Sequence, residues 1–214
     1  RSTIQSKRIL ADSLYEQGRH SEGEIYTRQA LESARELYGD DNQDVLYLRL
    51  SLAITLYEQG KKAEAESMLR DAIADHRRLF GEDSINTIDF KFALADVLSD
   101  RGKLDEAEAI FTQVVASWRR ALGNESRDTL HAMGNMARVL RKKGKISEAK
   151  AMLHDVLKVQ RRTLGDLDED TLESIGELAA VARAESDLGR AETLLREALA
   201  GYRQVRGDKH ADTL

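Results

Sequence analysis

The chain contains neither cysteine nor proline among its 214 residues. The absence of cysteine excludes disulfides and thiol chemistry, and it makes a reducing, cytoplasmic setting the default expectation. At an average usage of roughly 5%, a chain of this length would contain about ten prolines. Without them helices run uninterrupted, so the composition favours an all-α fold.

Long apolar segments are also missing. No apolar run approaches the roughly 18 residues of a membrane-spanning helix, and the first ten residues lack the apolar stretch of a signal peptide. Aromatic residues make up 5% of the chain and charged residues 33%, which suits helices with a thin core and solvated outer faces. The net charge of −5 argues against nucleic acid or an anionic membrane as the main partner.

What the sequence does contain is a repeat with a period of 42 residues. Similarity at a fixed period of this size predicts stacked supersecondary units, each contacting only its neighbours. The period is carried by glycines and alanines at fixed steps: Gly39, Gly81, Gly123, Gly165 and Gly207; Gly18, Gly60, Gly102 and Gly144; Ala11, Ala53, Ala95, Ala137 and Ala179.

Each repeat is predicted to form two helices. In the second repeat, apolar residues at helical spacing predict helices over about 45–59 and 63–80, ended by Gly60 and Gly81. A side chain able to cap a helix N-terminus precedes each first helix. These predicted caps are Ser2, Asp44, Asn86, Asp128, Asp170 and Asp212, and Asp170 has capping-box spacing with Glu173.

Small residues are expected where the helices approach closely. Ala53, Ala65 and Ala72 recur as small residues in the other repeats, and a leucine there would overpack the contact. Larger residues beside them, including Phe111 and Trp118, are expected to fill the space between repeats, so Trp118 is interpreted as a core residue.

These helix pairs, their alanine offsets and the phrase G-K-x-x-E-A-E resemble tetratricopeptide repeats. The long period and the phrases LG…DTL and GN-M-A resemble the kinesin light-chain-like subfamily. The resemblance implies an all-α, right-handed superhelical solenoid of five helix-turn-helix repeats with about ten helices. The repeats would span about 3–44, 45–86, 87–128, 129–170 and 171–212, and a sixth would begin at 213–214.

Three features depart from the subfamily pattern. The proline expected before the loop aspartate is replaced, for example by Arg127. The paired asparagines, which the family would use to hold a peptide backbone, survive only as Asn135. In the last repeat Ser186 replaces the turn glycine and Gly189 follows three residues later, so that turn is expected to be shifted or looser.

The resemblance also implies that the first helices line a concave groove for a partner peptide or protein. Its second repeat is aromatic and aliphatic, its third acidic and its fourth basic, which would complement a peptide with an apolar anchor followed by basic and then acidic residues. The predicted partner-binding residues are Arg8, Asp12, Tyr15, Tyr47, Leu50, Ile54, Tyr57, Asp89, Phe92, Asp96, His131, Asn135, Arg138, Arg141, Glu177 and Arg183. The alternatives are that these faces are simply solvated, or that the convex face, loops or helix ends bind instead.

A basic segment runs from Arg138 to Arg162, with nine lysines and arginines against Glu148 and Asp155. It could meet an acidic partner or phosphates, but it lacks the stacking aromatics and motifs of nucleic-acid-binding proteins. We therefore expect its charges to divide among several helix faces and serve solubility.

No residues are expected to form a catalytic, cofactor or metal site. The five histidines show no ligand spacing, and nothing resembles a nucleophile and base pair. Of these histidines, His131 is expected on the groove and His76 at a helix interface. Gly144 and Lys145 faintly resemble a phosphate-binding loop but lack its upstream glycine and strand.

Two functions stay open at this stage. The chain is either a non-enzymatic scaffold or adaptor, or the sensor segment of a larger signalling switch protein, such as an oligomerising ATPase or a caspase-like protease. No polar capping helix is recognisable at the ends, so we expect a piece of a longer protein whose isolated form associates end to end.

Overall fold

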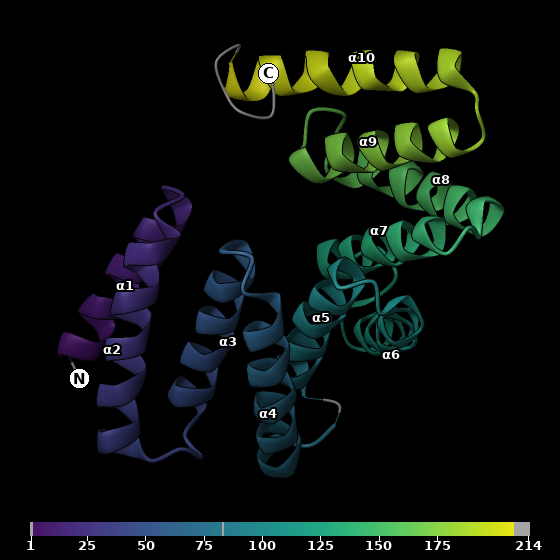
Figure 1. The fold of residues 1–214 in the computed structure, drawn as a ribbon. Coiled ribbons are helices and arrows are strands. Elements are labelled where there is room, and N and C mark those ends of the chain that lie inside the picture. Colours follow the sequence, from purple (N-terminus) through teal and green to yellow (C-terminus); the bar gives the residue numbers. More distant parts are fainter. Residues whose placement is uncertain (1, 83, 208–214) are drawn as a thin grey trace. The chain divides into compact units, whose positions relative to one another are not determined.

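The computed structural model describes residues 2–82 and 84–207, in which α-helices joined by short turns are the regular secondary structure (Figure 1). The prediction of an all-α fold with ten helices is confirmed for these residues. In chain order the helices are α1 (Ser2–Glu16), α2 (His20–Tyr38), α3 (Gln43–Glu58), α4 (Lys62–Phe80), α5 (Ile85–Asp100), α6 (Leu104–Leu122), α7 (Arg127–Lys142), α8 (Ile146–Thr163), α9 (Glu169–Ala184) and α10 (Leu188–Arg206).

The chain divides into two compact units, which we describe separately. Unit 1 spans Arg1–Lys103 and contains α1 to α5, and unit 2 spans Leu104–Leu214 and contains α6 to α10. Within each unit every helix packs against the next one in the chain. The first helices of neighbouring repeats also touch, α3 with α5 and α7 with α9. The candidate clefts lie along these side-by-side first helices.

The caps of the first helices lie two residues before the predicted positions. The side chains of Asn42 and Asp168 accept hydrogen bonds from the backbone amides of Asp44 and Asp170, at 2.8 and 3.0 Å. The predicted caps Asp44, Asn86, Asp128 and Asp170 are thus wrong, and so is the capping box with Glu173. At each of these helices two polar residues lie two positions apart. The earlier one occupies the N-cap position, although Ser84 makes no side-chain capping bond, and the later one lies in the first helical turn. Ser2 is the first residue of α1, and Asp212 lies outside the described residues.

The inner turn of the last repeat keeps its place without a glycine. Gly60 has φ of 77°, and its amide donates to the carbonyl of Tyr57 at 2.8 Å. Ser186 adopts φ of 64° and donates in the same way to Arg183 at 3.0 Å. The expected shift of this turn is therefore wrong. Packing of the two flanking helices holds a serine in the left-handed region, where a side chain is unfavourable.

The recurring LG…DTL phrase has a structural cause. The hydroxyl of Thr87 donates to the carbonyl of Gly81 at 2.9 Å, and Thr129 and Thr171 do the same to Gly123 and Gly165 at 2.9 and 2.8 Å. All three threonines are fully buried. Each bond ties the start of a first helix to the end of the preceding second helix, so the loop between repeats is fixed.

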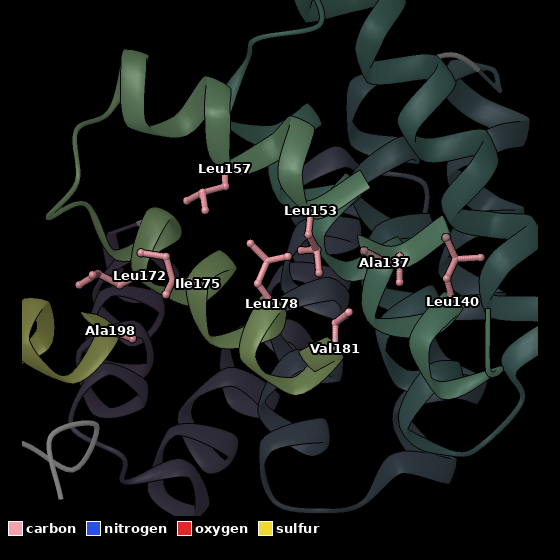
Figure 2. Close-up of a cluster of buried hydrophobic side chains, with 10 residues drawn as sticks. Ala137, Leu140, Leu153, Leu157, Leu172, Ile175, Leu178, Val181 and Ala198 are labelled. Carbon is pink, nitrogen blue, oxygen red and sulfur yellow. The ribbon is translucent and has the colours of Figure 1, made fainter. Parts of the chain in front are cut away.

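The predicted small and core residues are buried. Ala53, Ala65 and Ala72 are fully inaccessible, and Trp118 is 5% exposed, which confirms its interpretation as a core residue. In unit 2 the leucines of α8 and α9 form one apolar cluster together with alanines of α7 and α10 (Figure 2). The core is therefore a thin layer between successive helices, as a repeat array requires.

Ion pairs also join successive repeats, at the same period as the glycines. In three repeats, a lysine at the inner turn of the following repeat donates a hydrogen bond to a glutamate carboxylate. The acceptors are Glu24, Glu66 and Glu108, at 2.7, 2.8 and 2.6 Å. At the fourth position the charges are exchanged, and Lys150 donates to Glu185 at 2.7 Å. These contacts connect each second helix to the next helix pair.

Candidate functional site

A crevice lies between the first helices of neighbouring repeats and returns at equivalent positions. In unit 1 there are two such crevices. Cleft A, between α1 and α3, has a volume of about 750 Å³ and is lined by Ile4, Gln5, Arg8, Tyr38, Asn42, Asp44, Tyr47 and Leu48. Cleft B, between α3 and α5, has a volume of about 320 Å³ and is lined by Gln43, Asp44, Tyr47, Leu50, His76, Asn86, Asp89 and Phe90.

Cleft C, in unit 2, is the counterpart of cleft B two repeats later. It lies between α7 and α9, and its volume is only about 10 Å³. Its lining residues are Leu130, His131, Gly134, Asn135, Leu153, Gln160, Asp170, Glu173, Ser174 and Glu177. Most correspond to a residue of cleft B; for example, His131 stands where cleft B has Tyr47, and Gln160 stands where it has His76.

Tyr47 is the residue that clefts A and B share, together with Asp44. Its side chain is 51% exposed although it is a large aromatic residue. The guanidinium of Arg8 lies 5.8 Å from the centre of its ring, within the range of a cation–π contact. Arg8 is in turn held by Asp12, at 3.4 Å. The ring therefore stands on a ridge between two contiguous hollows.

Cleft B combines two carboxylates with an uncharged floor. Asp44 lies in the first turn of α3, and Asp89 lies on α5 just after its first turn. His76 forms the floor, where it is 1% exposed, and its Nδ1 lies 2.8 Å from the hydroxyl oxygen of Thr87. Because that hydroxyl already donates to Gly81, Nδ1 of His76 must carry the hydrogen. Burial lowers the pKa of His76, so the floor is neutral and the cleft carries net negative charge.

Tyr57 and the C-terminal end of α5 form a separate polar group in unit 1. The hydroxyl of Tyr57 donates to Asp100 at 2.6 Å, and the ammonium of Lys62 lies 3.4 Å from the same carboxylate. Lys62 also lies 5.7 Å from the centre of the Tyr57 ring. These contacts hold Tyr57 in place, so its predicted role as a partner-binding residue competes with a structural one.

The structure brings some of the predicted groove residues together. Arg8, Tyr47, Leu50 and Asp89 line clefts A and B, and His131, Asn135 and Glu177 line cleft C. Others lie elsewhere on the first helices: Asp12, Tyr15, Ile54, Tyr57, Phe92, Asp96, Arg138 and Arg141. Arg183 lines a different hollow, of about 310 Å³, formed with α10. That these residues bind a partner stays a prediction.

Burial alters the pKa of two predicted groove residues on α1, Asp12 and Tyr15. Burial raises the pKa of Asp12, although Arg8 opposes this effect. Burial also raises the pKa of Tyr15, and Glu58 adds to the effect. Both groups are thus partly withdrawn from solvent.

Several lining residues do not follow from the sequence pattern. Asp44 and Asn86 were interpreted as caps, and the true caps two residues earlier leave both side chains in the clefts. Gln160 was overlooked altogether, and His76 was expected only as an interface residue. The 42-residue period could have identified two of them. It places Ala34, His76, Trp118 and Gln160 at one buried position, where His76 and Gln160 are the two polar residues.

Many cations of the basic segment form ion pairs within unit 2. Lys143, Lys145 and Lys150 bind carboxylates of neighbouring repeats, at 2.5, 2.6 and 2.7 Å. Arg141 lies 3.3 Å from Glu177, and other arginines of the segment pair as well: Arg161 with Glu197, and Arg162 with Glu125. These ion pairs involve carboxylates on several helices. Because Arg141 is paired with Glu177, it is less available to bind the acidic residues that were predicted at the end of the partner peptide.

Within residues 2–82 and 84–207, no group of three or more acidic or histidine side chains could hold a metal ion. No described helix is both long and apolar enough to cross a lipid bilayer.

The periodic helix pairs, their turn glycines and the contacts between neighbouring first helices are those of a known repeat. The tetratricopeptide repeat model matches residues 2–78, 86–162 and 132–204. The chain belongs to the tetratricopeptide repeat family. Domains of this family generally bind proteins or peptides and are generally not catalytic. No curated protein has a sequence that matches this tetratricopeptide array.

Solved structures with the same arrangement include kinesin light chain-like proteins. The Q17M variant of such a protein from Podosopora anserina, with nearly identical TPR-like repeats, is 23% identical, with a TM-score of 0.77 over 95% of this chain and 96% of that one. BtubC (BKLC) from P. vanneervenii is 21% identical, with a TM-score of 0.77 over 95% of this chain and 81% of that one.

A peptide-bound regulator is also similar to this tetratricopeptide array. Bacillus thuringiensis PlcR, solved in complex with the peptide PapR7 and DNA, is 15% identical, with a TM-score of 0.73 over 95% of this chain and 71% of that one. At these identities the likeness is one of fold.

Proposed function

We propose that this tetratricopeptide array is a non-enzymatic interaction module that binds a partner peptide across clefts A and B of unit 1. The observation that carries the proposal is Tyr47, an aromatic side chain left half-exposed on the ridge between two contiguous clefts. Rigid aromatic side chains with a polar tip are favoured at binding surfaces, because they contribute contact area at low entropic cost.

The lining of cleft A suits an apolar or aromatic anchor. Ile4, Leu48 and the Tyr47 ring supply apolar surface, and Gln5 and Asn42 supply polar groups at the edge. A cleft of about 750 Å³ has the volume of a typical ligand pocket. Cleft A therefore has room for a large peptide side chain together with part of the neighbouring peptide.

The lining of cleft B suits a basic side chain. Asp44 and Asp89 supply negative charge, and Leu50 and Phe90 supply apolar contacts for the methylene groups of lysine or arginine. Since clefts A and B share Tyr47, the two peptide residues would lie on either side of this ring. The proposed ligand therefore carries an apolar anchor followed by a basic residue, which supports the order predicted from the sequence.

The proposal is tested with a displayed random-peptide library selected on the whole chain. The affinity of the selected peptides for Tyr47→Ala and for the control Tyr26→Ala is measured by calorimetry. Tyr26 lies on the second helix α2 and lines neither cleft A nor cleft B. Tyr47→Ala should lower the affinity at least tenfold, or about 1.4 kcal/mol, with unchanged helicity. Equal binding by the two variants would place the binding surface elsewhere.

The second candidate is the sensor segment of a larger switch protein. It is favoured by the likeness to PlcR, which was solved with a bound peptide. In that case the selected peptide should change the activity or assembly of the full-length protein, and it should lose this effect when Tyr47 is replaced. If the peptide binds but does not affect the full-length protein, the scaffold role is favoured.

A further inference from the structure

Cleft C contains a buried polar atom to which no described residue donates a hydrogen bond. Gln160 of α8 is 2% exposed, and its Oε1 accepts no hydrogen bond from any residue that the structure describes. Its counterpart in cleft B, His76, is satisfied by Thr87. The corresponding threonine of cleft C, Thr171, donates its hydroxyl hydrogen to Gly165, as Thr87 does to Gly81, so it has no hydrogen left to donate to Oε1 of Gln160. A buried acceptor of this kind calls for a donor from a bound group.

Three carboxylates line cleft C, and two of them are paired with an arginine. Asp170 is paired with Arg127 at 2.6 Å, and Glu177 is paired with Arg141 at 3.3 Å. Glu173 is exposed and forms no ion pair with the described residues. The cleft is therefore suited to a group with a single positive charge, and it disfavours carboxylates and phosphates.

The dimensions of cleft C admit only a small group. Its volume of about 10 Å³ corresponds to roughly one water-sized sphere. Gly134 on its rim has no side chain, and a Cβ atom placed there would meet nothing within 4 Å. The equivalent position of cleft B is Leu50. The missing side chain leaves a way into the cleft that a leucine would cover.

We propose that cleft C binds a primary ammonium group, the head of a lysine side chain on a partner chain. The ammonium donates one hydrogen bond to Oε1 of Gln160, and Glu173 balances its charge. The planar guanidinium of arginine is too wide for a space of this size. This inference does not depend on the peptide proposed for clefts A and B.

The test is an NMR titration of the whole chain with N-acetyl-lysine methylamide, at mildly alkaline pH so that an ordinary imidazole is uncharged. The side-chain amide resonances of Gln160 should shift in a saturable manner. The norleucine analogue, which lacks the ammonium, should leave these resonances in place, and the arginine analogue should shift them at least tenfold more weakly.

Two variants and a control complete the test. Glu173→Gln should lower the lysine affinity at least fivefold, and Gly134→Leu should abolish saturation. The exposed Glu148→Gln, a matched loss of charge on α8, should change the affinity less than twofold. Equal shifts with norleucine, an unchanged affinity in Glu173→Gln, or a water molecule at Gln160 that the lysine compound does not displace would overturn the proposal.

Discussion

The carboxylate of Glu24 connects the first repeat of unit 1 to the second, and its removal gives the sharpest test of the packing described above. Burial alone would raise the pKa of Glu24, but hydrogen bonds from Lys61, Arg28 and Gln59 outweigh this effect and lower the pKa to about 2. Lys61 and Gln59 lie at the inner turn between α3 and α4, so these bonds join α2 to the next helix pair.

The expected energy follows from the pKa. A fall from 4.5 to about 2 corresponds to about 3 kcal/mol, at roughly 1.4 kcal/mol per tenfold change in proton affinity. Arg28 and Lys61 are each 45% exposed, and solvent screening reduces the expected contribution to about 2 kcal/mol. Because the folded pKa lies below the unfolded value, this stability is present above pH 4.5 and is lost as the pH falls toward 2.

Hydrogen exchange of the Gly60 and Lys61 amides, which close the inner turn, measures local opening without requiring two-state unfolding. Glu24→Gln should speed exchange at these amides about 30-fold at neutral pH, the equivalent of about 2 kcal/mol. The difference from the unaltered chain should disappear near the folded pKa of about 2. Glu32→Gln, an exposed change on the same helix, is the control. A difference that does not depend on pH would refute the reasoning.

Three further predictions concern stability. Ser186→Gly should raise the free energy of unfolding by about 1 kcal/mol in a urea titration, because glycine accepts the left-handed backbone of this turn; an unchanged value would contradict the strain. Gly176→Ala, in the open middle of α9, should stabilise by about 1 kcal/mol, whereas Gly201→Ala should lose this gain, because its Cβ would lie 2.3 Å from Leu172. Equal melting temperatures for the two alanine variants would count against that contact. Ala95→Leu should destabilise by about 1–3 kcal/mol, since Ala95 is fully buried between helices; a melting curve like that of the unaltered chain would show that the site has spare room.

The period of the sequence was enough to predict the helices, because each one depends on local signals. Gly60 and Gly81 end their helices where predicted, and Ala53 and Trp118 are buried as their spacing indicated. The caps were misplaced, since two neighbouring polar residues compete for one role, and propensity does not distinguish Asn42 from Asp44. The turn at Ser186 was expected to shift because local preference was given more weight than the packing of the flanking helices.

The candidate sites could be predicted only in part. The helical face that carries Tyr47 follows from its position in the repeat, since the period places side chains on one face of each first helix. The sequence by itself also determined the number of helices, the small residues between them and the family. These features depend on contacts within a repeat or with its nearest neighbour, which the period reproduces.

The tertiary structure alone decided which residues meet between repeats. It placed Asp44 in two clefts, paired cations of the basic segment with carboxylates of other repeats, and left Oε1 of Gln160 buried with no hydrogen-bond donor among the described residues. The volumes of clefts A, B and C differ although their positions are equivalent, because each depends on side chains from three or more helices. The volume of a cleft and the charges that line it are determined only when the helices pack against one another.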